Sequence, residues 1–191
     1  MARERKFSTE DLFQSAKEIL LQHGYEGFTF SLLAERMNVS RSALYKYYEN
    51  KEELITDYMI FEMNQFLLDL ESLDHLEGFE SQFDRLLEII FKHSKIHQIL
   101  GMAHRISSSI NDKVKSNKQL LDKQHVEMYN RFQNFIKLGR DEHRLKPHIA
   151  DGLVLGFIFQ SINIPNHFAI SQTEWIRSIK EILSQGMFRN K

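Results

Sequence analysis

Residues 28–54 constrain the fold more than any other stretch, because they predict two short helices around a tight turn. Apolar residues recur at helical spacing from Leu32 to Met37, and the Thr29 hydroxyl can cap the free amides ahead of them. Asn38 can adopt the left-handed backbone conformation that ends a helix. Ser40 can then cap a second helix.

The second short helix has two different faces. Leu44 and Tyr48 are four residues apart and should pack inward, whereas Arg41, Ser42 and Tyr45 share another face. A short polar helix fixed on a hydrophobic corner is typical of a helix-turn-helix, whose second helix enters the major groove of DNA.

This stretch resembles the DNA-binding segment of the TetR family of bacterial transcriptional regulators, which includes the TetR/AcrR-like proteins. The residues that carry the resemblance are 24–29, Ala34, 39–48, Asn50, Lys51 and Leu54. The turn, the Leu-Tyr pair and the trailing lysine occur together at the expected spacing. The resemblance implies a helix-turn-helix DNA-binding domain at residues 1–50 and a ligand-binding and dimerisation domain at residues 51–191.

The same resemblance implies which side chains contact DNA. Candidates for reading base edges are Ser31, Arg41, Ser42 and Tyr45. Candidates for binding phosphates are Thr29, Ser40, Lys46, Tyr47 and Lys51. Arg41 alone among them can make a bidentate contact to guanine, whereas phosphate contacts fix register without reading sequence. Ser42 and Ala43 stand at positions that vary across the family, and Ala43 has no hydroxyl for a phosphate, so the resemblance does not imply the operator sequence of any relative.

Two prolines and eight glycines in 191 residues, with little alternation of apolar and polar residues, predict an all-α fold of about nine helices. Outside the short pair, we expect helices at about 8–23, 51–70, from 79 onward, 96–107, 111–138, 147–163 and 174–187. Pro147 would stand in the first turn of one helix, and Thr173 would cap the last.

The helix expected at 147–163 is apolar on several sides, so one core cannot bury all of it. A homodimer built on this helix and the last one would cover the remainder, while an internal core helix in a monomer is the alternative. The residues expected at the dimer interface are Leu153, Phe157, Trp175, Ile179 and Ile182.

Fifteen phenylalanines and seven methionines are more than one amphipathic face needs. Some could line a pocket for an unidentified apolar small-molecule effector, although each could equally be ordinary core. The candidates are Phe61, Phe66, Phe91, Met102, Met128, Phe132, Phe135 and Phe159. No cofactor is expected.

Three histidines would share one face of a continuous helix, namely His93, His97 and His104. Two imidazoles four residues apart can hold zinc, but a helix boundary is expected near residue 95, and no cysteine or carboxylate completes the set. No metal site is assigned, and convergence of the three on a metal stays open.

Charge alone does not indicate a nucleic-acid partner. Residues 1–51 hold eight Lys/Arg and seven Asp/Glu, and the whole chain has a formal net charge of −1. Placement is more informative, because Arg3, Arg5 and Lys6 precede the first helix, and Arg41 and Lys46 lie in the expected reading helix.

Other classes of protein are less consistent with the sequence. It has no cysteine, no Gly-rich phosphate loop and no Gly-x-Ser-x-Gly elbow, so we do not expect an enzyme. No apolar run approaches the roughly 18 residues of a membrane span, and no secretory signal is evident, so we expect no membrane partner and a cytoplasmic location. The predicted function is a ligand-inducible repressor that binds a pseudo-palindromic DNA operator as a dimer. The alternative is a helical small-molecule-binding or interaction protein whose helix-turn-helix no longer reads DNA.

Overall fold

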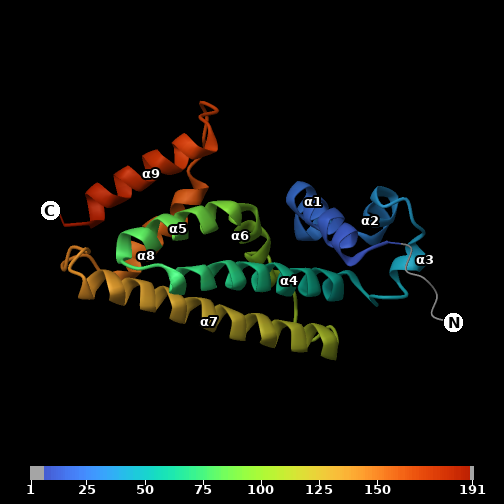
Figure 1. Ribbon diagram of the computed structural model, residues 1–191. Helices are drawn as coiled ribbons and strands as arrows, with labels where there is room; N and C mark the ends of the chain where they lie inside the picture. Colours follow the sequence, from blue (N-terminus) through green and yellow to red (C-terminus); the bar gives the residue numbers. More distant parts are fainter. Residues whose placement is uncertain (1–6, 190–191) are drawn as a thin grey trace. The chain divides into compact units, whose positions relative to one another are not determined.

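The computed structural model describes residues 7–189, and the all-α prediction is confirmed for that range (Figure 1). In chain order the α-helices are α1 (Thr9–Gly27), α2 (Phe30–Arg36), α3 (Arg41–Leu44), α4 (Lys51–Glu71), α5 (Phe79–Lys92), α6 (Ser94–Leu100), α7 (Asp112–Asp141), α8 (Asp151–Gln160) and α9 (Gln172–Met187). Three short 3-10 helices accompany them, η1 (Ser72–His75), η2 (Ala103–Arg105) and η3 (Ser161–Asn163).

The chain forms two compact units, and each is built from two separate segments. The first unit contains the residues up to Asn64 together with Lys95–Lys123, and the second contains Gln65–Ser94 together with Gln124–Lys191. Both α4 and α7 therefore contribute one segment to each unit. A division into domains at residues 50 and 51 stays a prediction.

In the first unit, α1 begins with a reciprocal cap. The Ser8 hydroxyl accepts a hydrogen bond from the Asp11 amide at 2.9 Å, and the Asp11 carboxylate accepts one from the Ser8 amide at 3.4 Å. Gly24 has a φ of 68°, which kinks the helix where the sequence predicts its end, and a further turn continues to Gly27. The buried face of α1 consists of Leu12, Phe13, Ala16, Ile19, Leu20 and Tyr25.

A set of polar contacts joins the start of α7 to the first turns of α4, also within the first unit. The Asn117 amide donates to the Thr56 hydroxyl at 2.9 Å and to the Asp57 carboxylate at 2.7 Å. Asn111 caps α7 through the Val114 amide and donates its own amide to Glu53 at 2.6 Å. Because Asn117, Thr56 and Glu53 are buried, each bond satisfies a polar group that would otherwise be costly.

The core of the second unit is a cluster of aromatic rings. The Phe79 ring lies 4.7 Å from that of Phe135 and 5.1 Å from that of Phe188, and Phe83 lies 5.0 Å from Phe188. Residues of α5, α7 and the end of α9 thus meet around one buried centre. Among the described residues, the extended pairing consists of one isolated antiparallel bridge between Leu145 and Phe188.

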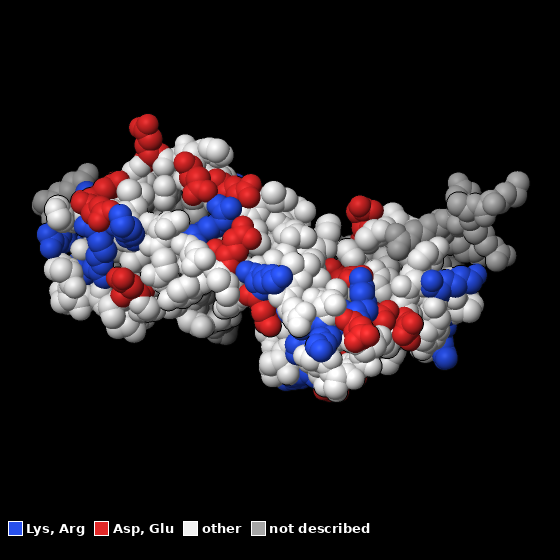
Figure 2. All heavy atoms as spheres, turned by 90° about the horizontal axis from the view of Figure 1, so that it is seen from below, with Lys and Arg blue, Asp and Glu red and all other residues white. Residues whose placement is uncertain are grey.

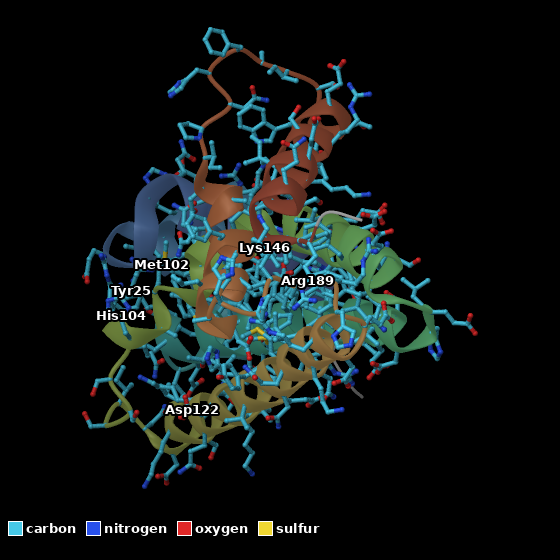
Figure 3. All side chains as sticks on the ribbon, turned by 90° about the vertical axis from the view of Figure 1, so that its left-hand side faces the viewer. Tyr25, Met102, His104, Asp122, Lys146 and Arg189 are labelled. Carbon is cyan, nitrogen blue, oxygen red and sulfur yellow. The ribbon has the colours of Figure 1, made fainter. Side chains whose placement is uncertain are left out.

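The C-terminal end of α9 is held by the segment that follows α7. The Lys146 ammonium donates to the carbonyls of Gln185 at 3.1 Å and Gly186 at 2.8 Å, which lack intrahelical partners. Backbone bonds join Lys146 to Met187 and Arg189 to Arg144, both at 2.9 Å. Lys146 and Arg189 are labelled at this end of the unit in Figure 3.

Three expectations about helix ends are wrong. The helix expected at 147–163 begins at Asp151, because Arg140 donates to the carbonyls of Lys146 and Ile149 and holds the segment containing Pro147 outside the helix. The helix expected at 96–107 consists of α6 followed by η2. The cap of α9 is Ser171, whose hydroxyl accepts from the Glu174 amide at 3.3 Å, and not Thr173.

Gly139 offers a test of the aromatic core. A Cβ at this position would lie 2.6 Å from Phe79 Cε2 and 2.9 Å from Leu145 Cδ1, closer than packed atoms approach. We expect Gly139→Ala to lower the free energy of unfolding by about 1–3 kcal/mol, despite the better helix propensity of alanine. Lys137→Ala is the control, since this exposed side chain on the same helix should matter by less than about 0.5 kcal/mol. Urea unfolding of both variants measures the difference, and equal stabilities would contradict this packing.

Candidate nucleic-acid interface

The turn between α2 and α3 has the geometry that the sequence predicts, except that Ser40 stands at the N-cap of α3 without a capping bond from its side chain. Thr29 caps α2, with its hydroxyl accepting from the Leu32 amide at 3.2 Å. Asn38 has a φ of 51°, in the left-handed region, and the Val39 amide donates to the Ala34 carbonyl at 2.9 Å. These bonds fix the direction in which the chain enters α3.

Helix α3 is four residues long, and a further turn follows it. The amides of Tyr47 and Tyr48 both donate to the Leu44 carbonyl, at 2.9 and 3.2 Å. Leu44 and Tyr48 are buried, whereas Arg41 and Tyr45 are exposed. The two faces assigned from the sequence are therefore present.

Four side chains are the candidates for reading bases, and the structure brings them onto one exposed surface. The Arg41 guanidinium of α3 donates to the Ser31 hydroxyl of α2 at 3.4 Å. The Ser42 and Ser40 hydroxyls share a hydrogen bond of 2.9 Å. Tyr45 keeps half of its surface exposed while its ring packs edge-on against Phe30, with 4.9 Å between the ring centroids.

The candidates for binding phosphates surround this surface but differ in their surroundings. Lys46 and Tyr47 are exposed, and the Tyr47 ring lies edge-on to Phe7 at 5.7 Å. Thr29 and Ser40 are exposed too, although the Thr29 hydroxyl already accepts the capping bond.

Lys51 is half-buried and already makes two contacts. Its ammonium donates to the Tyr25 carbonyl at 3.0 Å and lies 4.4 Å from the centroid of the Tyr25 ring. An ammonium carries three donors, so a phosphate contact is compatible with this arrangement. The contacts connect the start of α4 to the end of α1.

Tyr25 is a residue whose positioning role the sequence analysis missed. Its hydroxyl donates to the Glu52 carboxylate at 2.8 Å, and burial together with this carboxylate raises the pKa of Tyr25 to about 12. The phenol thus stays neutral and keeps donating at physiological pH. A buried tyrosine one residue after a helix-breaking glycine, paired with a Lys-Glu sequence at the next helix start, is the signal that could have indicated it.

The formal net charge of the chain is −1, and charges of both signs lie on the face shown in Figure 2. On the face shown in Figure 2, Lys and Arg side chains are interspersed with Asp and Glu side chains rather than gathered into one basic surface. Arg3, Arg5 and Lys6 lie outside the described residues. The case for nucleic acid therefore rests on the side chains of α2 and α3 and not on a general field.

The candidate pocket residues fall into different environments. In the second unit the Phe132 ring lies 6.5 Å from Phe66 and 4.7 Å from Phe159, so these three are brought together. Phe135 packs in the aromatic core, and Phe61 packs against Phe13 of α1 at 5.2 Å. Phe91 is buried, while Met102 and Met128 are half-buried.

The three histidines make separate contacts. His93 is buried, with Nε2 2.6 Å from the Asp69 carboxylate and its ring edge-on to Phe66 at 5.2 Å. Burial raises the pKa of Asp69, but the hydrogen bonds from Lys92 and His93 outweigh it and lower that pKa overall. His104 Nδ1 pairs with the Gly101 carbonyl, and His97 is exposed. In the described part of the chain, no group of three or more His, Cys, Asp or Glu side chains is placed to hold a metal ion.

Comparison with known proteins supports the structural evidence. Residues 12–58 match the family model described as bacterial regulatory proteins, tetR family. No curated protein matches the sequence. Between residues 7 and 189, no helix is long and apolar enough to cross a membrane.

Solved structures of transcriptional regulators resemble the whole chain. The ketosteroid transcriptional regulator KstR2 of Mycobacterium tuberculosis is 16% identical, with 98% of each chain covered and a TM-score of 0.74. The fatty acid degradation regulator FadR from Bacillus halodurans is 14% identical, with 96% of this chain and 98% of that chain covered and a TM-score of 0.68. FadR from Bacillus subtilis, solved in complex with stearoyl-CoA, is 17% identical, with 94% and 99% covered and a TM-score of 0.65.

With this turn and this exposed α3 face, residues 12–58 match the tetR family of bacterial regulatory proteins, and the chain has the fold of solved transcriptional regulators. The family model covers most of α1, both helices of the helix-turn-helix and the start of α4, and the remainder of the described chain has the helical fold of the solved regulators.

Lys51 offers a test of the contact between the start of α4 and the end of α1. We expect Lys51→Met to lower the free energy of unfolding by about 1–3 kcal/mol, because a charged hydrogen bond and a cation–π contact are lost. Lys46→Met is the matched control, since that lysine is exposed and its loss should leave stability unchanged. Urea unfolding distinguishes the two, and a Lys51 variant as stable as the Lys46 variant would rule out the structural role.

Proposed function

We propose that this protein is a ligand-responsive transcriptional repressor that binds a pseudo-palindromic operator as a homodimer. The observation that carries the proposal is the exposed pair of Arg41 and Ser31, which a rigid turn positions at the junction of α3 and α2. The other components are the apolar face of α8 and α9 and the aromatic side chains of the second unit.

Sequence reading is assigned to the face of α3. A guanidinium has five N–H donors, and Arg41 uses one of them on Ser31, so four remain, enough for the O6 and N7 acceptors of guanine. Ser42 and Tyr45 lie on the same face and can reach neighbouring base edges or the thymine methyl. Lys46 and Tyr47 follow directly in the chain, where they would bind the flanking phosphates.

Dimerisation is assigned to α8 and α9. Leu153, Phe157 and Ile182 are 56%, 60% and 71% exposed, an unusual amount of aliphatic and aromatic surface for two adjacent helices. One helix-turn-helix reads few base pairs, so two related by a two-fold axis are needed for useful specificity. Trp175 is half-buried and Ile179 is buried within the single chain, so these two would support the interface from behind.

The effector is assigned to the apolar class. Phe66, Phe132 and Phe159 form a chain of rings contributed by α4, α7 and α8. A similar regulator was solved in complex with stearoyl-CoA, whose acyl chain is apolar, and another is named for ketosteroids, which are largely hydrophobic. Fatty acids, acyl thioesters and lipophilic cations are therefore the classes to test.

Arg41 tests sequence reading. We expect Arg41→Ala to weaken operator binding by about 1–3 kcal/mol and to relax preference at one base pair in each half-site. Arg41→Lys is the control, since it keeps the charge but loses the bidentate fork, so it should keep non-specific affinity and lose the base preference. Competition gel shifts with operators altered at single positions measure both. Unchanged preference in both variants would favour the alternative, a helical binding protein whose α3 does not read DNA.

Effector binding tests the switch. We expect an acyl thioester such as stearoyl-CoA to bind and to weaken operator affinity roughly 5–150-fold, with operator DNA weakening effector binding by the same factor. Titration calorimetry with and without operator measures this reciprocity. Arg41→Ala serves as the control, because it should bind the effector as the parent does. Binding that leaves operator affinity unchanged would rule out an inducible switch.

A further inference from the structure

The loop between η3 and α9 exposes three large hydrophobic side chains. Phe168 is 88% exposed, the highest value among the large hydrophobic residues there, and Ile164 and Ile170 beside it are also exposed. This loop extends away from the helices of its own unit (Figure 3). A phenylalanine side chain in water leaves on the order of 150–250 Å² of apolar surface unburied.

The loop has a defined conformation. The Asn166 side chain bridges it, donating to the Ile170 carbonyl at 2.7 Å and accepting from the Ile170 amide at 3.0 Å. Ala169 has a φ of 49°, a left-handed conformation that alanine rarely adopts outside a constrained turn. Phe168 therefore stands at the tip of a closed turn, and a partner that binds it would not have to order a flexible segment.

The same unit carries an apolar groove between α8 and α9. Phe157, Ile182 and Leu183 line its middle, and the two halves that share them each have a volume of about 350 Å³. Ile164 lines the end next to the Phe168 loop. The opposite end is lined by Ile149, Leu153, Gly186 and Met187.

In a two-fold symmetric dimer, the Phe168 loop of one copy can face the α8–α9 groove of the other. If the axis passes through the middle of the groove, the paired helices run antiparallel, and the loop end of one copy meets the opposite end of the second. The Phe168 side chain of each copy can then enter the α8–α9 groove of the other copy, so the same contact forms twice. A partner that matched only one of the two features would leave either Phe168 or the α8–α9 groove exposed.

We propose that Phe168 of each protomer inserts into the α8–α9 groove of a second copy, at the end lined by Ile149, Gly186 and Met187. The inference rests on the proposed function, because it gives the homodimer its main anchoring contact. A standard interface buries about 800 Å² per partner, so one ring would contribute roughly a quarter of it. A rigid aromatic side chain in an apolar pocket is the usual form of an energetic hot spot.

Sedimentation equilibrium tests the contribution of the ring. We expect the parent chain to be a dimer at micromolar concentration. Phe168→Ala should raise the dissociation constant of the dimer about 30-fold for each of the two Phe168 contacts that it removes. His167→Ala, an exposed neighbour in the same loop, should leave the constant unchanged. Circular dichroism confirms that the single chain stays folded, as expected for a side chain that packs on little of it.

Cross-linking tests the destination of the ring. The chain has no cysteine, and a Cβ at Gly186 meets no atom within 4 Å, so both engineered thiols should be accommodated. We expect the double variant Phe168→Cys with Gly186→Cys to form a covalent dimer under mild oxidation, at a protein concentration raised to offset the loss of the ring. Phe168→Cys with Lys137→Cys, placed on the exposed face of α7, should not do so.

The outcomes distinguish the two proposals. A monomeric parent at micromolar concentration would overturn the homodimer, and the Phe168 contact with it. A dimeric parent whose dissociation constant is insensitive to Phe168→Ala would overturn the Phe168 contact alone. An intramolecular disulfide in the double variant, seen as an oxidised monomer, would also overturn it, because the ring would then occupy its own groove.

Discussion

The exposed face of α3 depends on the buried contacts of Leu44 and Tyr48 behind it. A four-residue helix has no stability of its own, since helix nucleation costs more than one turn of hydrogen bonds returns. Packing of Leu44, together with the left-handed turn at Asn38, therefore fixes where Arg41 points. A contact from Arg41 to a base contributes most to the binding free energy when the side chain is already oriented before DNA binds. Ordering it on binding would cost part of that free energy.

The same unit extends this rigidity along the chain. Lys51 and Tyr25 join the start of α4 to the end of α1, and Asn111 and Asn117 join the start of α7 to the next turns of α4. Buried or half-buried hydrogen bonds thus connect α1 through α4 to the start of α7. Any effector that shifts this part of α7 would act directly on α4, which begins at Lys51, a candidate for phosphate binding.

Local sequence signals predicted the local structure well. Thr29, Asn38 and the Leu44–Tyr48 pair act through neighbours three to five residues away, so spacing was enough to place them. Contacts between distant segments were missed, as at Arg140, which delays the start of α8, and at Tyr25, which binds Lys51. Helical spacing predicted that Ile179 lies on an apolar face. It did not show whether that face is buried within the single chain, as the structure has it, or in a dimer.

Genome-wide selection of DNA fragments by the purified protein tests whether α3 reads a DNA sequence. We expect the recovered fragments to share a pseudo-palindrome with two equivalent half-sites. We also expect the Arg41→Ala protein to recover fragments in which one base pair of each half-site is no longer conserved. Recovery of fragments with no common sequence by the parent protein, at a salt concentration that suppresses non-specific binding, would contradict sequence reading by α3.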